Sequence, residues 1–342
     1  MAYVDENLND PSLFFETLTW TGDGNTPRSL TGLDFQPNMI WSKRRDDAAG
    51  HNLLDSVRGA GTNSELCPSS NGIEGSNAAE TYGYLSAFTS DGFTVTAGSS
   101  DNAYWNNNTA TYVAWCWKES ATAGFDIVSY TGNATARDIS HSLSAVPKTM
   151  FIKNRSTAGA WMVYHESLGY NSGTIPRFLQ LDNTNAQNNG GSGDFPADPT
   201  SSVFKVGTYD TMNKNTDSII AYLWSEKQGF SKFGTYTGNG STDGPFIYTG
   251  FRPAMVIAKE KSGTGHWRVR DNKRSTYNPV GIVSHANATT ADTTEDDIDF
   301  LSNGFKLYTS GGENNGSGDT YCYWAFAEAP FVNSNGVPCN AR

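Results

Sequence analysis

The 342-residue sequence has few charged side chains, very few basic ones, and no long apolar run. Charged residues make up 17% of the chain, and 24 Lys and Arg against 35 Asp and Glu leave a net charge of −11. Because a negative protein repels phosphate, and the longest basic run is only Lys43 to Arg45, we expect no nucleic-acid partner.

No apolar run approaches the about 18 residues of a membrane helix, and the acidic, polar start does not resemble a signal peptide. We therefore expect cytoplasmic synthesis and no membrane insertion.

The chain also lacks a metal or disulfide pattern. Its four cysteines show no CxxC spacing, which favours free thiols over a zinc site or a disulfide scaffold; they are Cys67, Cys116, Cys322 and Cys339. The acidic stretch from Thr293 to Asp299 offers hard oxygen ligands, but it lacks the glycine and terminal glutamate of an EF-hand loop. A solvated loop is the preferred interpretation of this stretch, with calcium binding left open, and no metal site is predicted.

Catalytic motifs are absent as well. The sequence contains no GxSxG, HExxH or GxxxxGK[ST], and its five histidines share no recurring carboxylate partner. We expect no catalytic residues, no cofactor and no enzymatic activity. An unrecognised pair of carboxylates for sugar hydrolysis stays open as an alternative, because sequence alone cannot locate such a pair.

What the chain does have is an internal repeat. An aromatic followed by Thr-Gly-Asn or Thr-Gly-Asp begins at Trp20, Tyr130 and Tyr236, at separations of 110 and 106 residues. Further residues keep these two offsets. They are Pro37, Pro147 and Pro253; Lys43, Lys153 and Lys259; and His51, Trp161 and Trp267. Each copy closes with an apolar strand that runs to a glutamate at Glu119, Glu226 or Glu328.

The repeat and the composition together predict an all-β fold of three tandem homologous β-sandwich units. Gly, Ser, Thr and Asn are abundant, aromatics reach 13%, and each copy contains about seven short apolar runs bounded by turn residues. The predicted divisions are a lead segment at 1–14 and units at 15–122, 123–229 and 230–342, the last with a C-terminal tail. Short connections favour packing around a common axis, with pseudo-threefold symmetry, over a linear rod.

Function is expected in the variable segments of the repeat, at 59–84, 182–201 and 284–299, because rigid scaffolds carry binding groups on loops. Trp161 and Trp267 keep the repeat offset and are interpreted as core. Tyr104 and Trp105 lie among turn formers, so an exposed ring pair that stacks on a sugar face is one interpretation, and a lid over the end of the sandwich is the other. These two residues are the candidate ligand-binding site.

Three long stretches resemble a group of repeat-built structural proteins of tailed bacteriophages, abundant among phages of marine bacteria. They are "FSKFGTYTGNGSTDGPFIYTGFRPAMVIAKEKS", "DIDFLSNGFKLYTSGGENNGSGDTYCYWAFAEAPF" and the ending "NSNGVPCNAR". The resemblance extends from about Phe15 to Arg342 and carries over no catalytic residue. It implies a β-rich virion protein of the tail fibre, adhesin or capsid-decoration type.

From this resemblance we expect a non-enzymatic virion structural protein, a compact tail-associated fibre or knob that binds a host surface receptor. The alternatives are a capsid decoration protein without a host ligand and a tailspike-like polysaccharide depolymerase. The expected partners are other tail or capsid proteins, a host surface glycan or protein, and further copies of the chain within the particle.

Overall fold

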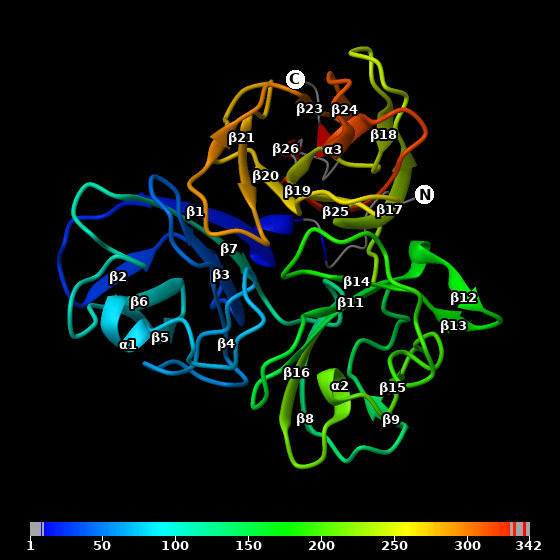
Figure 1. Cartoon of the computed structure of the whole chain (residues 1–342). Helices are drawn as coiled ribbons and strands as arrows, with labels where there is room; N and C mark the ends of the chain where they lie inside the picture. Colours follow the sequence, from blue (N-terminus) through cyan, green and yellow to red (C-terminus); the bar gives the residue numbers. More distant parts are fainter. Residues whose placement is uncertain (1–7, 9, 329–330, 333–337, 340–342) are drawn as a thin grey trace.

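The computed structural model describes residues 8, 10–328, 331–332 and 338–339, and nearly all of its regular elements are β-strands. The chain forms three groups of strands arranged around a common centre, coloured blue to cyan, green, and yellow to red in Figure 1. The all-β class predicted from the composition is therefore confirmed. Within the described part of the chain the helices are single turns, and none could span a membrane.

Each group contains one large antiparallel sheet. The first sheet has the order β1 (Phe15–Thr21), β7 (Thr111–Trp117), β3 (Met39–Arg44), β4 (Asn52–Asp55). The second has the order β14 (Phe178–Gln180), β11 (Met162–His165), β10 (Thr149–Asn154), β16 (Ser218–Trp224), β8 (Phe125–Thr131). The third has the order β17 (Ser231–Thr237), β25 (Thr320–Ala327), β19 (Pro253–Glu260), β20 (Arg268–Asp271), β21 (Ile282–His285), β22 (Thr293–Thr294).

A small sheet lies over the outer face of each large one. The small sheets are β2 (Arg28–Thr31), β6 (Gly92–Thr96) and β5 (Tyr84–Thr89); β15 (Val203–Val206) and β9 (Arg137–Ser140); and β18 (Phe246–Tyr248), β24 (Gly304–Leu307) and β23 (Ile298–Leu301). The remaining elements of the described residues are two short hairpins and five single turns. These are β12 (Tyr170–Ser172) with β13 (Ile175–Pro176), β26 (Phe331–Val332) with β27 (Pro338–Cys339), α1 (Ala79–Tyr82), α2 (Asp210–Asn213), α3 (Gly312–Asn315), η2 (Pro11–Leu13) and η3 (Glu166–Leu168).

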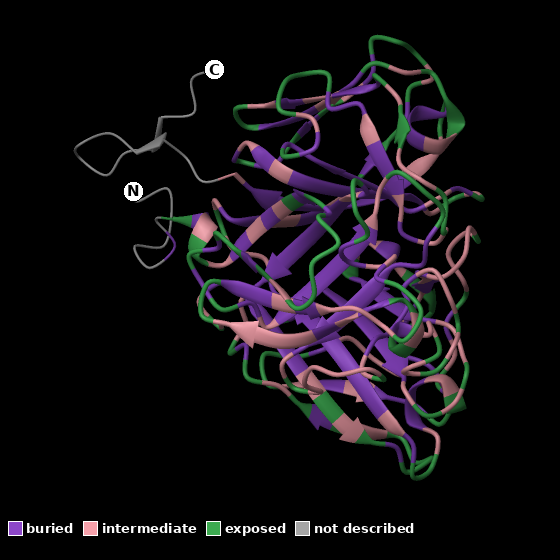
Figure 2. Cartoon of the chain, turned by 90° about the vertical axis from the view of Figure 1, so that its left-hand side faces the viewer, coloured by how far each residue is buried: buried purple, intermediate pink, exposed green. Residues whose placement is uncertain are grey.

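Four apolar clusters fill this architecture. Three of them lie between a large sheet and its small sheet, and each is built from one group of strands only. The fourth lies at the centre and contains side chains from all three large sheets, among them Trp117, Trp224 and Phe326. The Trp117 ring lies 6.3 Å from Trp224 and 5.5 Å from Phe326, edge to face in both cases. Both faces of each large sheet are thus buried, as the purple strands in Figure 2 show.

The repeated aromatic–Thr–Gly–Asx motif forms a turn that closes over a buried asparagine. Asn106, Asn213 and Asn315 are fully buried, and each accepts a backbone N–H from the motif, the donors being residues 23, 133 and 239. The motif's aromatic side chain donates to the carbonyl just before that asparagine, as in Trp20 Nε1 to Trp105 O at 2.8 Å. The motif glycine is needed because a Cβ at residue 132 would lie 2.0 Å from the Lys214 carbonyl oxygen. The turn chemistry and the close approach together explain why the motif recurs.

The recurring lysines join one strand group to the next. Lys43, Lys153 and Lys259 are buried on β3, β10 and β19, where desolvation lowers the pKa of each to about 8. Each ammonium donates at 3.2 Å to a backbone carbonyl of another group, at Thr289, Asn71 and Thr184 respectively. The first group therefore contacts the third, the second contacts the first, and the third contacts the second.

Two further sets of hydrogen bonds run in the same direction around the centre. Trp115 Nε1 donates to Asp271 Oδ2 at 3.0 Å, Tyr222 Oη to Asp55 Oδ2 at 2.6 Å, and Trp324 Nε1 to Thr149 Oγ1 at 2.8 Å. The carbonyls of His285, Cys67 and Gln180 accept from the rings of His51, Trp161 and Trp267. Every neighbouring pair of groups is thus joined by three kinds of buried polar contact.

The predicted divisions near residues 122 and 229 fall in the connections from Trp117 to Phe125 and from Trp224 to Ser231. The prediction of three homologous copies stays an interpretation of the sequence. Cys67, Cys116 and Cys322 are buried free thiols, and the side chain of Cys339 lies outside the described part of the structure.

Candidate functional site

Tyr104 and Trp105 point in different directions, so they do not form the ring pair that the sequence suggested. Trp105 is only 1% exposed and packs edge to face against Phe93 in the first sandwich core. Its ring is therefore part of the lid over the sandwich, and it is not available to stack on a ligand. Tyr104 is half-buried, packs against the edge of the same core and lies beside Tyr82.

Tyr104 lines an open groove of about 520 Å³ on the first strand group. Its walls come from the β3–β4 connection at 47–50, from the variable segment at Cys67, Ser69, Ser70, Asn77 and Tyr82, and from the loop at 101–104. Thr289, from the third group, completes the wall. The groove is thus formed at the contact between two strand groups.

The Tyr82 and Tyr104 rings form an aromatic pair in this groove. Their centroids are 5.3 Å apart and the ring planes are tilted by 58°. Tyr82 is 38% exposed, so its ring is open to a ligand. Burial raises the pKa of Tyr104 to about 12, which keeps its hydroxyl protonated near neutral pH. That hydroxyl lies 3.5 Å from Asn77 Oδ1.

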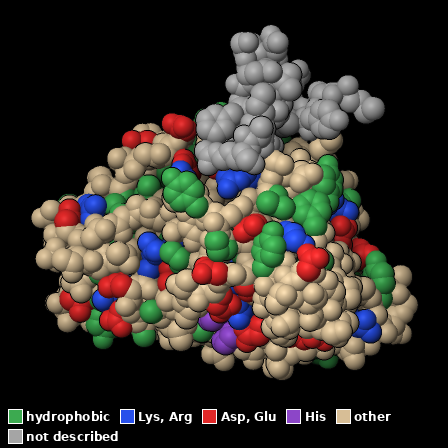
Figure 3. Space-filling view, turned by 90° about the horizontal axis from the view of Figure 1, so that it is seen from above, with side chains coloured by type: hydrophobic (Ala, Val, Ile, Leu, Met, Phe, Trp, Pro, Cys, Tyr) green, Lys and Arg blue, Asp and Glu red, His purple; other side chains and the backbone are tan. Residues whose placement is uncertain are grey.

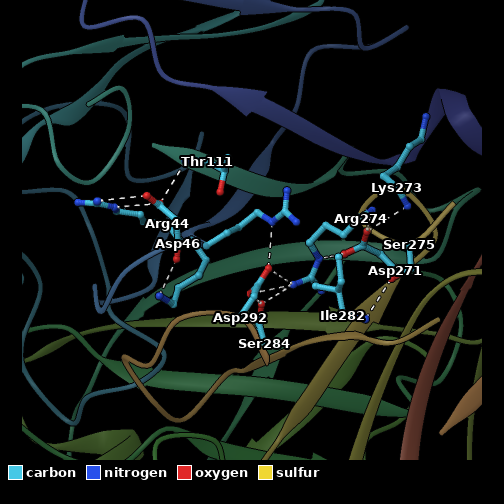
Figure 4. A network of polar contacts seen from close by, with 12 residues as sticks. Arg44, Asp46, Thr111, Asp271, Lys273, Arg274, Ser275, Ile282, Ser284 and Asp292 are labelled. Carbon is cyan, nitrogen blue, oxygen red and sulfur yellow. Dashed lines mark hydrogen bonds and ion pairs between the residues drawn. The ribbon is translucent and has the colours of Figure 1, made fainter. Parts of the chain in front are cut away.

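Charged side chains form the rim of the groove. Asp47, Asp101 and Arg44 all line it. Arg44 is held by Asp46, whose Oδ1 lies 3.1 Å from Arg44 Nε and also accepts the backbone N–H of Thr111 (Figure 4). The guanidinium also lies 3.4 Å from Asp47 Oδ2, so its positive charge is largely balanced. The groove presents oxygen acceptors and amides more than free positive charge.

The Thr289 wall is fixed by hydrogen bonds from the first group. The Thr289 carbonyl accepts both the Lys43 ammonium and the Ala49 backbone N–H, the latter at 2.8 Å. Nearby, Asp292 accepts from Arg45 Nε at 2.9 Å and from Arg274 Nη1 at 3.1 Å. Arg274 also donates to Asp271 Oδ2 at 2.6 Å, in the network drawn in Figure 4. The Arg45–Asp292 ion pair and the hydrogen bonds to the Thr289 carbonyl join the two walls of the groove, and Arg274 positions Asp292 from within the third group.

Two of the four carboxylates in the acidic stretch at 293–299 are paired with arginines. Glu295 pairs with Arg268, and Asp297 Oδ1 lies 2.6 Å from Arg270 Nη2. Asp297 also accepts from Asn314, so its oxygens are already used. Among the residues that the structure describes, no group of three or more His, Cys, Asp or Glu side chains could hold a metal ion.

The other residues singled out by the repeat are buried. Pro37 and Pro147 precede β3 and β10, Pro253 begins β19, and all three are buried. Trp161 and Trp267 are fully buried in the central cluster. These positions build the scaffold and do not line the groove.

Sequence reasoning missed Tyr82, Asn77 and Thr289 as groove residues. The available signal was the variable segment 59–84, which supplies five of the groove-lining residues. Thr289 had no signal, because it reaches the groove only through the contact between the first and third groups.

Two comparisons with known proteins bear on this site. A family model described as "Domain of unknown function (DUF7483)" matches residues 10–330, which includes every residue of the groove. No curated protein matches the chain.

Proposed function

Since the chain belongs to the DUF7483 family of unknown function, we propose from its own residues that it is a non-enzymatic, adhesive structural protein of a phage virion. In this proposal it forms a compact knob that binds a host surface glycan. The observation that carries the binding role is the open groove with its Tyr82 and Tyr104 rings. The virion setting rests on the sequence resemblance to phage structural proteins.

The composition of the groove favours a sugar. Sugar rings present apolar C–H faces, which pack on aromatic rings, and hydroxyls at their edges, which need hydrogen-bond partners. Tyr82 and Tyr104 supply the rings, while Ser69, Ser70 and Asn77 supply hydroxyl and amide partners. An aromatic surface bordered by a few polar groups is typical of a ligand site.

The charge distribution favours a neutral sugar over an acidic one. Carboxylates accept hydrogen bonds from hydroxyls but repel uronate and sulfate groups. Asp47 and Asp101 line the groove, and Arg44, the one basic side chain among the described residues that line it, is paired with Asp46 and Asp47. The net charge of −11 acts in the same direction.

Titration calorimetry with a panel of hexasaccharides tests this proposal. The neutral members are maltohexaose, cellohexaose, chitohexaose and mannohexaose, and an alginate hexamer is the acidic comparison. We expect at least one neutral hexasaccharide to bind and the alginate hexamer not to bind.

Replacing Tyr104 by alanine removes one stacking ring, so Tyr104→Ala should weaken binding about tenfold, which is about 1.4 kcal/mol. Tyr277→Ala is the matched control, because that ring is 83% exposed and does not line the groove. Unchanged affinity in Tyr104→Ala, or absence of binding across the panel, would contradict the proposal.

A depolymerase is the second candidate, because Asp47 and Asp101 line the same groove and hydrolysis of glycosides uses two carboxylates. Incubation with the bound hexasaccharide separates the two functions. Release of reducing ends that disappears in Asp101→Asn would replace the adhesive role with a catalytic one. A capsid decoration role is distinguished by the position of the chain on intact particles.

A further inference from the structure

A second groove, of about 410 Å³, lies on the second strand group. It is lined by Gln180, Asp194, Thr208, Tyr209, Asp210 and Thr211, together with two apolar side chains. We propose that it is a second saccharide-binding site, so that one chain binds two glycan segments at once. This inference rests on the proposed function of the Tyr104 groove.

The two grooves are built from corresponding pieces of the fold. At the contact with the next strand group, the backbone carbonyls of Cys67 and Gln180 make corresponding hydrogen bonds. Each accepts a buried indole N–H from that next group, at 3.0 and 2.9 Å respectively. Cys67 lines the first groove and Gln180 lines the second.

On the outer side, Tyr104 and Thr211 each lie two residues before a fully buried asparagine, Asn106 or Asn213. Each asparagine binds the Gly-Asx turn of its own group. The loop that lines the first groove therefore has the same anchor as the loop that lines the second.

The second groove shares with the first an accessible tyrosine ring bordered by carboxylate, amide and hydroxyl groups. Tyr209 is 54% exposed, and its ring lies so close to the Gly193 backbone that a Cβ there would be 2.6 Å from the ring. The ring thus packs against Gly193 while about half of the residue stays open to solvent. Asp194 and Asp210 supply carboxylates, and Gln180 and Thr208 supply amide and hydroxyl groups. A neutral sugar fits this set for the reasons given for the first groove.

The corresponding place on the third group is filled by ion pairs. Glu313 lies two residues before the buried Asn315, as Tyr104 does before Asn106. Arg268 Nε donates to Glu313 Oε2 at 3.0 Å, and Arg268 also pairs with Glu295. His285, whose carbonyl accepts from His51, stacks on His266 at 4.3 Å. In Figure 3 the purple histidine side chains near the lower edge have acidic and basic side chains beside them. We therefore expect two sites per chain and not three.

The test is the binding stoichiometry of the full chain in titration calorimetry, with the tightest-binding neutral hexasaccharide of the panel. The expected value is two for the wild type. In Tyr104→Ala or Tyr209→Ala one site should keep the wild-type affinity, and the other should weaken about tenfold and so drop out of the high-affinity count. Tyr277→Ala should keep two. Tyr209 is exposed and Tyr104 is half-buried against the first core, so circular dichroism and the melting temperature of each variant verify that the fold is retained.

The outcomes separate this inference from the proposed function. If the wild type binds at one site, and that site is lost in Tyr104→Ala but kept in Tyr209→Ala, the second site is overturned and the proposed function still stands. One site that is lost only in Tyr209→Ala overturns both the two-site inference and the assignment of the Tyr104 groove. Three sites would overturn the closed third position. No binding contradicts the proposed function and the inference with it.

Discussion

At several positions in the turns and connections, the structure accepts only one type of residue or gives the residue a specific partner. The repeated motif requires glycine because a Cβ at residue 22, 132 or 238 would lie about 2 Å from a backbone oxygen.

The glutamates that close each copy differ in their partners. Glu226 pairs with Lys232 at 2.7 Å, whereas Glu119 accepts the Ile127 backbone N–H at 3.3 Å and has the Asp126 carboxyl group as a neighbour. One connection thus carries an ion pair and the other a pair of carboxyl groups.

Gly132→Ala should destabilise the protein by about 1–3 kcal/mol, because the new methyl group must displace the Lys214 backbone. Urea unfolding measures this change. Gly312→Ala is the control, since a Cβ at that position meets nothing within 4 Å, and its stability should stay within about 0.5 kcal/mol of wild type. Equal stability of the two variants would contradict the close-approach explanation.

Glu119 should make stability depend on pH near neutrality. Burial, followed by the hydrogen bond with Asp126, raises the pKa of Glu119 to about 7. A raised pKa in the folded state means that protonation stabilises the fold, so this contribution is present at acidic pH and is lost as the pH rises through about 7.

Melting temperatures measured from pH 5.5 to 8 should therefore fall less steeply in Glu119→Gln than in the wild type. Glu226→Gln, which removes the ion pair with Lys232, should keep the wild-type slope. A Glu119→Gln profile parallel to the wild type would show that Glu119 does not change its protonation in this range.

At the scale of elements, the sequence indicated the strands well and the groove only in part. The apolar runs in the second copy coincide with β8, β10 and β16, because each alternates with turn residues that end a strand. Trp105 was misplaced as a candidate ligand contact because adjacent residues in an irregular loop share no periodicity that tells inside from outside. Tyr82 meets Tyr104 only after α1 folds against the loop at 101–104, and that is a long-range contact without a local signal.

The hydrogen bond from Tyr222 in β16 to Asp55 in β4 links two large sheets and should be measurable. Tyr222→Phe leaves the buried Asp55 Oδ2 with Arg58 as its remaining partner, so we expect a loss of about 1–3 kcal/mol. Guanidinium unfolding gives the value. Tyr277→Phe alters an exposed ring and should change stability by less than about 0.5 kcal/mol. If Tyr222→Phe leaves the free energy of unfolding unchanged, this hydrogen bond does not help to hold the two sheets together.

At the scale of the whole molecule, the central cluster and the polar contacts around it favour cooperative unfolding. Three independent sandwiches would each have a separate core. Here Trp117, Trp224 and Phe326, one from each large sheet, lie in the same core. We expect a single calorimetric transition whose calorimetric and van't Hoff enthalpies agree. Tyr222→Phe should shift that whole transition. Separate transitions for the strand groups would contradict a shared core.

The contact between the first and the last long strand has a consequence for connectivity. Phe15 in β1 stacks on Phe326 in β25 with centroids 5.1 Å apart, so the interface between the third and first groups contains the same kind of contacts as the two interfaces that the chain crosses. The arrangement of the three groups in space therefore does not depend on which group comes first along the polypeptide. A circularly permuted chain that starts between β7 and β8, with β25 leading on to β1, would have the same three interfaces available to it.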